Sequence, residues 1–126
     1  MPEFPREVVE AARSARQVTL TTLGRKSGKR RRVTIWIASE GDSLFVRSGG
    51  GMVRDWPQNL EDRGEAELKV GGHVARVRPR RIDQADEARA VSQLYRAKYG
   101  FSVKPSKPSE PLTKGETATF ELLPAD

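Results

Sequence analysis

The chain contains no cysteine among its 126 residues. Disulfide bonds, a thiol nucleophile and a zinc–thiolate site are therefore excluded. The single histidine, His73, follows a Gly-Gly turn and has no partner at the spacing of a metal site, so no metal-binding residues are predicted. With one histidine on a turn, no Ser-His-Asp arrangement can be recognised either. The sequence therefore offers no recognisable basis for metal or triad chemistry.

Long apolar runs are also lacking. No run approaches the roughly 20 residues that span a bilayer, and residues 1–7 contain no apolar signal core. We therefore expect a cytoplasmic protein without a transmembrane segment. Hydrophobic residues make up 36% and charged residues 32% of the chain, which permits one modest core and predicts a single domain over residues 1–126.

Positive charge, in contrast, is abundant and concentrated. The formal net charge is +6, which favours anionic partners such as phosphorylated cofactors or nucleic acids. Six of the eight residues from Arg25 to Arg32 are basic, and Gly24, Ser27 and Gly28 shape the start of this run. The run lies between two short segments rich in β-branched residues, so the sequence predicts a strand, a tight cationic loop and a second strand.

The remaining pattern predicts a mainly β protein of the α+β class. Turn signals at Gly41 and at Gly71-Gly72 favour hairpins, and six antiparallel strands with two to three short helices would close as a small barrel. Pro79 places the strand that contains it at an edge or a bulge. Asp55 and Asp83 are predicted N-caps. Strands are expected at residues 17–23, 32–39, 43–48, 65–70, 73–82 and 117–123, with helices near residues 5–16 and 54–61 and after Asp83. The proline-rich segment 102–116 is expected to be a flexible loop or lid within the domain.

The basic loop does not have Walker spacing. Only three residues separate Gly24 from Gly28, and Lys29 is followed by Arg30 instead of a hydroxyl residue. Backbone N–H groups freed by glycine, together with arginine side chains, can still bind a phosphate or a carboxylate. The alternative is a solvated run of charge that binds nothing. Repulsion between like charges in a short loop favours the anion site, and both interpretations stay open.

A second candidate site follows the third predicted strand. Ser48 directly precedes a run of three glycines. Trp56 and Asn59 lie three residues apart and are expected on one helical face. An indole can wall a pocket for a flat ring, and an amide can bond to the ring's heteroatoms. The alternative is that Trp56 is a core residue. Tyr95 and Tyr99 are predicted to pack in the core, although Tyr99 could lean over a pocket.

Residues 20–31, from Leu20 to Arg31, resemble the signature of the deazaflavin-dependent nitroreductase family. The segments Ser48-Gly49-Gly50, 56–60 and 70–72 are similar to the family's later segments, in the same order. That family consists of flavin and deazaflavin oxidoreductases with the split β-barrel of the pyridoxamine phosphate oxidase group, so the resemblance implies a six-stranded antiparallel split β-barrel. The sequence departs from the family at Arg30, where Pro is common, and at Pro57, where Tyr is usual.

A second resemblance involves other segments. Ile35-Trp36, residues 44–48 and residues 95–100 are similar to an uncharacterised group of the same barrel superfamily. The chain is therefore also a candidate for an uncharacterised side branch. That group implies no activity.

The nitroreductase resemblance implies a hydride transfer between a bound cofactor and a small organic acceptor. The expected cofactor is a deazaflavin coenzyme of the 8-hydroxy-5-deazaflavin type, with FMN as the alternative. Catalytic residues stay unassigned, with Tyr95 and Tyr99 as the candidates, and a homodimer is expected by analogy. The implied phosphate and acidic-tail contacts are Arg25, Lys26, Ser27, Gly28 and Arg31, and the implied contacts along the cofactor are Ser48, Gly49, Trp56 and Asn59.

The alternative function is a non-enzymatic small barrel that binds a cofactor or a nucleic acid. Trp36 and Phe45 lie on predicted strands, but they are interpreted as barrel interior, and no nucleic-acid recognition motif is present. Nucleic acid is therefore the less favoured partner. A carrier of a small acidic ligand is a third possibility.

Overall fold

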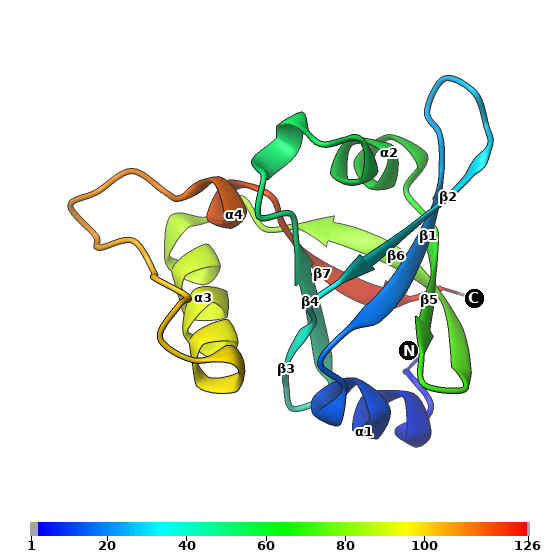
Figure 1. Cartoon of the computed structure of the whole chain (residues 1–126), viewed down its shortest axis with the longest axis horizontal. Coiled ribbons are helices and arrows are strands. Elements are labelled where there is room, and N and C mark those ends of the chain that lie inside the picture. Colours follow the sequence, from blue (N-terminus) through cyan, green and yellow to red (C-terminus); the bar gives the residue numbers. More distant parts are fainter. Residues whose placement is uncertain (1–2, 126) are drawn as a thin grey trace.

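β-Branched and apolar runs form a curled antiparallel sheet in the computed structural model, which describes residues 3–125 (Figure 1). The sheet is a half-barrel of seven strands in the order β2-β1-β5-β6-β7-β4-β3. The elements in chain order are α1 (Arg6–Ser14), β1 (Val18–Leu23), β2 (Arg30–Ile35), β3 (Ala38–Glu40), β4 (Ser43–Arg47), the 3-10 helix η1 (Gly51–Val53), α2 (Asp55–Arg63), β5 (Ala66–Val70), β6 (His73–Arg81), α3 (Ala85–Tyr99), α4 (Lys114–Thr117) and β7 (Thr119–Pro124).

The predicted α+β class and antiparallel sheet are confirmed, but the predicted count of six strands is wrong. The single strand expected at residues 32–39 is two strands, β2 and β3, separated by Trp36 and Ile37. The two strands follow one another in the chain and yet form the two opposite edges of the sheet. The chain bends here because side chains of α3 bond to the backbone of Ile37: its N–H donates to Tyr99 Oη at 3.1 Å, and its carbonyl accepts from Lys98 Nζ at 2.9 Å.

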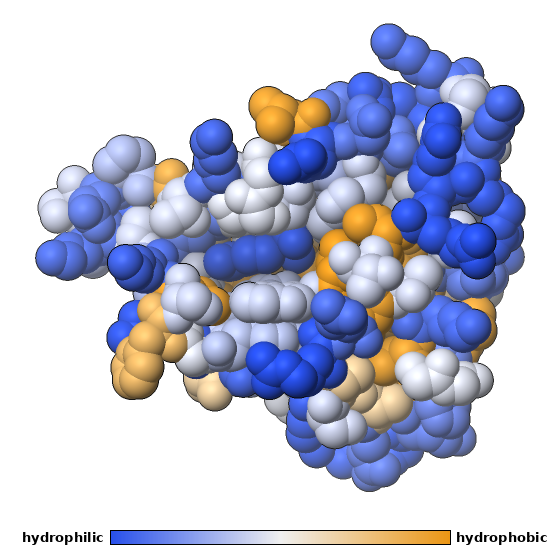
Figure 2. Space-filling model, viewed as in Figure 1, coloured by the Kyte–Doolittle hydropathy of each residue, from blue (hydrophilic) through white to orange (hydrophobic). Residues whose placement is uncertain are grey.

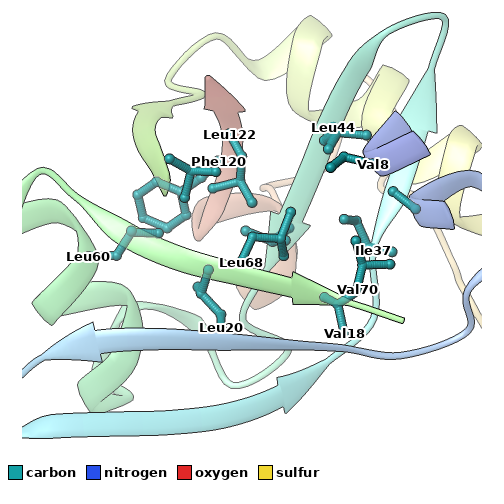
Figure 3. Packing of buried hydrophobic residues seen from close by; sticks show 13 residues of the cluster. Val8, Val18, Leu20, Ile37, Leu44, Leu60, Leu68, Val70, Phe120 and Leu122 are labelled. Carbon is teal, nitrogen blue, oxygen red and sulfur yellow. The ribbon is translucent and has the colours of Figure 1, made fainter. Parts of the chain in front are cut away.

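The main core fills the inside of the curled sheet. Leu20 of β1 and Leu68 of β5 pair across neighbouring strands and are both fully buried. Val8 of α1 and Leu60 of α2 enter this core from opposite ends (Figure 3). The two helices therefore close the ends of the half-barrel, as their narrow apolar faces require.

A second core lies outside the barrel, where α3 packs on β3 and β4. Leu44 and Val46 of β4 point to the main core, and Phe45 between them points to α3, as strand alternation requires. The prediction that Phe45 lies in the barrel interior is therefore wrong, because a helix covers the outer face of its strand. The same prediction for Trp36 is also wrong, since this side chain is 42% exposed.

Several local predictions also need correction. Asp55 is the first residue of α2 and not its N-cap, and Gln84, one residue after Asp83, is the N-cap of α3. Within the predicted loop 102–116, α4 begins at Lys114 behind a capping box formed by Thr113. Pro79 lies in an interior strand, but at this position β6 pairs with β7 alone, so the missing N–H breaks no ladder.

Residues 3–125 contain no helix that could cross a bilayer and no cluster of side chains that could hold a metal ion. None of the helices there combines the length and the apolar character needed to cross a bilayer. In the same range, no group of three or more His, Cys, Asp or Glu side chains is arranged to hold a metal ion.

Candidate functional site

A cavity of about 670 Å³ lies where the loop between β1 and β2 meets the start of α2. Figure 1 shows this loop at the upper right, beside α2. The sheet ladder brings the basic loop to this place, because β1 and β2 pair up to Leu23 and Arg30. The cavity is lined by Gly24, Arg25, Lys26, Ser27, Arg31, Arg32, Val33, Arg54, Asp55, Trp56 and Asn59. We call it the basic cavity.

The basic loop has a defined shape. Gly28 N donates to Gly24 O and Gly24 N to Lys29 O, both at 2.8 Å, so the loop closes on itself. Gly28 has a φ of 71°, which a side chain would strain. A Cβ at Gly24 would lie 2.6 Å from the hydroxyl of Ser27. Both glycines are therefore needed for the turn. The basic loop has an ordered, hydrogen-bonded conformation.

Helix α2 holds the loop in place. The Oδ1 atom of Asn59 accepts two hydrogen bonds from Arg25, one from its backbone N–H at 3.1 Å and one from Nη1 at 2.9 Å. Arg63, one turn later, donates to Gly24 O at 2.8 Å. Asn59 is 3% exposed, so its amide fixes the loop from inside the protein. The sequence predicted a contact along a ligand for Asn59, and the observed role is to position Arg25.

Five cations and one carboxylate line the basic cavity. Arg25 approaches Asp55 at 3.7 Å, whereas no carboxylate of residues 3–125 forms an ion pair with any of the other four. Arginines of β6 differ, because Arg76, Arg80 and Arg81 each pair with a glutamate. Hydrophilic side chains cover the surface over the β1–β2 loop at the upper right of Figure 2. Uncompensated positive charge is thus concentrated here, where it can attract an anion. The four lining cations that form no ion pair within the described part of the chain are Lys26, Arg31, Arg32 and Arg54.

The structure brings together six of the nine residues predicted to contact a cofactor. Gly28 shapes the same loop without lining the cavity. Ser48 is buried and its N–H donates to Ala118 O at 3.0 Å, and Gly49 lines another cavity. The sequence analysis did not predict that Arg54 lines the cavity. Its position directly before α2, next to Trp56, could have indicated it. The six that line the basic cavity are Arg25, Lys26, Ser27, Arg31, Trp56 and Asn59.

A second cavity, of about 340 Å³, lies at the other end of β2. The rings of Trp36 and Tyr99 stack beside it with centroids 4.1 Å apart and planes within 4°. The cavity is lined by Thr34, Ile35, Trp36, Arg47, Gly49, Tyr95 and Val103. We call it the aromatic cavity.

The two tyrosines proposed as catalytic candidates bond to backbone carbonyls. Tyr95 Oη donates to Phe45 O at 3.2 Å, and Tyr99 Oη lies 2.7 Å from Arg16 O. Burial raises the pKa of both phenols above the ordinary value. These contacts favour a structural role for the two hydroxyls over proton transfer at neutral pH.

A family model decides the relationship of the chain to known proteins. The model of the family described as "Uncharacterized protein conserved in bacteria (DUF2255)" matches residues 8–122. The chain belongs to the DUF2255 family. This membership agrees with the second sequence resemblance, to an uncharacterised branch of the barrel superfamily. No protein in the curated set matches this DUF2255 chain.

Solved structures show how widely the fold of this DUF2255 protein is shared. An F420-H2-dependent reductase, FDR-A, superposes with a TM-score of 0.64 at 22% identity over 85% of this chain and 93% of the reductase. The heme storage protein HutZ from Vibrio cholerae gives 0.69 at 12% identity, over 99% and 92%. A Listeria innocua protein, provisionally assigned as a pyridoxamine 5′-phosphate oxidase, gives 0.67 at 6%, over 95% and 92%. At these identities the likeness establishes the split-barrel fold for the DUF2255 chain.

Proposed function

We propose that this DUF2255 protein is an oxidoreductase that binds a deazaflavin coenzyme of the 8-hydroxy-5-deazaflavin type, or alternatively FMN, in the basic cavity. It would transfer a hydride between that cofactor and a small organic acceptor. One observation carries the proposal: four cations that form no ion pair within residues 3–125 surround a cavity that is also walled by a half-buried tryptophan. The fold supports this proposal, because an F420-H2-dependent reductase has the same fold.

The basic cavity suits a ligand with an anionic end and a flat end. Its volume of about 670 Å³ lies within the range of roughly 300–1,000 Å³ common for small-molecule sites. Lys26 and Arg31 can bond to a phosphate or an acidic tail, and the Ser27 hydroxyl can donate a further bond. Trp56 offers a face for a flat ring.

In this proposal the protein supplies position and charge. A bound deazaflavin or flavin would donate or accept the hydride itself. Asn59 orients Arg25, and the closed loop presents its cations in a fixed arrangement. Trp56 would exclude water from one side of a bound ring. None of these tasks requires a protein acid or base.

A binding titration tests the proposal. Deazaflavin coenzyme and FMN are each added to Trp36→Phe protein, in which Trp56 is the single remaining tryptophan. We expect its emission to be quenched in a saturable way. Arg31→Ala should weaken binding about tenfold or more, because a charge-assisted hydrogen bond contributes roughly 1.5–3 kcal/mol.

Arg78→Ala is the matched control, since Arg78 is exposed and lies outside the cavity. If neither cofactor binds at low salt, the proposal is wrong. If a cofactor binds but its reduced form passes no hydride to any of a panel of nitroaromatic and quinone acceptors, the non-enzymatic binding protein is the better interpretation.

A further inference from the structure

We propose that Arg54 is a specificity-determining contact for a phosphoryl group in the basic cavity, and that Gly50 positions this arginine by having no side chain. The inference rests on the proposed anion site of this cavity. It applies to any phosphorylated ligand, so it does not depend on hydride transfer.

The side chain of Arg54 lies directly over Gly50. A Cβ atom at Gly50 would overlap Nε of Arg54, and it would lie 3.0 Å from Cγ and 3.2 Å from Cδ of the same side chain. Gly50 has a φ of −85°, a negative value that other residues also adopt. What glycine provides at this position is therefore space for the arginine.

The turn beneath the arginine is fixed to the neighbouring helix. Gly50 directly precedes the 3-10 helix η1 and Arg54 directly follows it, so this single turn brings the two residues together. Gln58 of α2 donates to Met52 O of η1 at 2.7 Å, which holds the turn against α2. An arginine packed on such a support loses less rotamer freedom on binding a ligand than one that is free in solvent.

The guanidinium of Arg54 is available to a ligand. It lines the basic cavity, and within residues 3–125 it forms no hydrogen bond and no ion pair. Asp55, the next residue, approaches Arg25 instead, at 3.7 Å. Arg63 of α2 differs, because it donates to Gly24 O at 2.8 Å and so helps to build the loop. The N–H donors of Arg54 can therefore all serve a bound anion.

The cations around the cavity come from different elements. Arg31 and Arg32 belong to β2, whereas Arg54 directly precedes α2. A phosphoryl group has enough oxygens to bond to more than one guanidinium group, and the arginine fork matches its geometry. A carboxylate has fewer oxygens to share among several arginines. The arrangement therefore favours a phosphoryl group that Arg54 contacts from the α2 side.

Calorimetric titration with inorganic pyrophosphate at low salt tests the contact without any cofactor. We expect saturable binding that Arg54→Ala weakens about tenfold. Gly50→Ala should weaken it about three- to tenfold, because the added methyl group displaces the arginine. In the double variant the loss should equal that of Arg54→Ala alone, since the glycine acts only through the arginine.

Gly49→Ala is the matched control. A Cβ atom at Gly49 meets nothing within 4 Å, and Gly49 does not line the basic cavity, so pyrophosphate affinity should stay unchanged. Flavins provide a second comparison. Gly50→Ala should weaken FMN and leave the affinity for riboflavin, which has no phosphate, unchanged, whereas a general disturbance of the cavity would weaken both.

Three results would overturn the inference. One is the absence of saturable pyrophosphate binding. The second is unchanged pyrophosphate affinity in folded Arg54→Ala or Gly50→Ala protein, as judged by melting temperature. The third is a loss from Gly50→Ala that is equally large in the Arg54→Ala background. The Arg54→Ala comparison stands even if Gly50→Ala fails to fold. Pyrophosphate binding that depends on both residues, without binding of deazaflavin or FMN, would instead count against the oxidoreductase alone.

Discussion

At the scale of single residues, Glu116 is a charge that its surroundings hold tightly. It is fully buried and accepts hydrogen bonds from Ser92 Oγ at 2.8 Å, Thr113 N at 2.9 Å and Ser106 N at 3.2 Å. Burial alone raises the pKa of this carboxyl, but the hydrogen bonds outweigh burial and lower it to about 2. Glu116 thereby ties α4 and the preceding segment to α3.

Because of this lowered pKa, the free energy of unfolding should decrease as the pH falls. The pKa of Glu116 is lower in the folded state than in the unfolded chain, so its contribution is present above about pH 4.5 and is lost as pH falls towards 2. The loss amounts to at most about 3 kcal/mol. Glu116→Gln should be less stable by about 2 kcal/mol near pH 7, with a much smaller difference near pH 3.

Urea unfolding at the two pH values measures this effect. Glu40→Gln is the control, because Glu40 is exposed and should leave the pH dependence of unfolding unchanged. If wild type and Glu116→Gln lose stability in parallel on acidification, the charge of Glu116 is not what stabilises the α3–α4 contact.

Asn59 provides a second prediction at this scale. Asn59→Ala removes the acceptor that holds both the backbone and the side chain of Arg25. We expect a loss of about 1–2 kcal/mol in unfolding free energy and weaker binding of an anionic ligand in the basic cavity, because the loop is no longer fixed. Gln58→Ala is the control on the same helix, since Gln58 bonds to Met52 O and does not line the cavity. If both variants weaken binding equally, the effect comes from a general change in α2, and the bond from Asn59 to Arg25 is not what fixes the loop.

Sequence and structure agree on single residues where the signal is local. Arg25, Lys26, Arg31, Trp56 and Asn59 were expected to contact one cofactor, and they line one cavity. The burial of Arg47 was missed, because one arginine at the end of a strand looks like an ordinary polar residue. It comes from α3, which lies more than 40 residues later in the chain and buries the guanidinium.

At the scale of elements, α3 controls the path of the sheet. The helix bonds to the bend between β2 and β3 through Lys98 and Tyr99, and Tyr99 also supports the indole of Trp36. The break could not be predicted, because residues 32–39 have the continuous composition of a strand and the cause of the bend lies about 60 residues away. Strand and helix positions otherwise followed from alternation and turn signals, which are local. A flexible lid at residues 102–116 stays a prediction.

Tyr99→Phe tests the role of α3 at the bend. The variant keeps the ring and its stacking but leaves the buried N–H of Ile37 without its acceptor. We expect a loss of about 1–3 kcal/mol in unfolding free energy and faster hydrogen exchange at Ile37. The emission of Trp36, measured in Trp56→Phe background, should stay close to that of the parent. Unchanged exchange at Ile37 would show that the bend holds without the phenol.

At the scale of the whole molecule, the net charge of +6 is unevenly compensated. Glutamates pair with three of the four arginines of β6, whereas within residues 3–125 most cations around the basic cavity form no ion pair. The surface therefore favours a compact anion at one place over a long polyanion along one face. The homodimer expected from the resemblance stays a prediction, which light scattering would test.

Salt dependence distinguishes a compact anion from a polyanion. We expect FMN to be weakened only several-fold between about 50 and 500 mM NaCl, because few charges are matched. A short oligothymidylate should bind more weakly than FMN and be displaced by it. A nucleic-acid protein would instead bind the oligonucleotide more tightly, with a steep salt slope set by several phosphate contacts. Fluorescence anisotropy of a labelled strand measures both.

The bend at Trp36–Ile37 also limits how this family can diverge. Because side chains alternate between the faces of a strand, moving the bend by two residues along the chain would preserve which residues of β2 and β3 face inward. Moving it by one would turn Ala38, the single apolar residue of β3, away from the core that it forms with α3. Lineages that reshape the aromatic cavity are therefore expected to shift the bend by even steps. Shifting the bend by one residue in the laboratory, with the chain length kept constant, should therefore destabilise the fold.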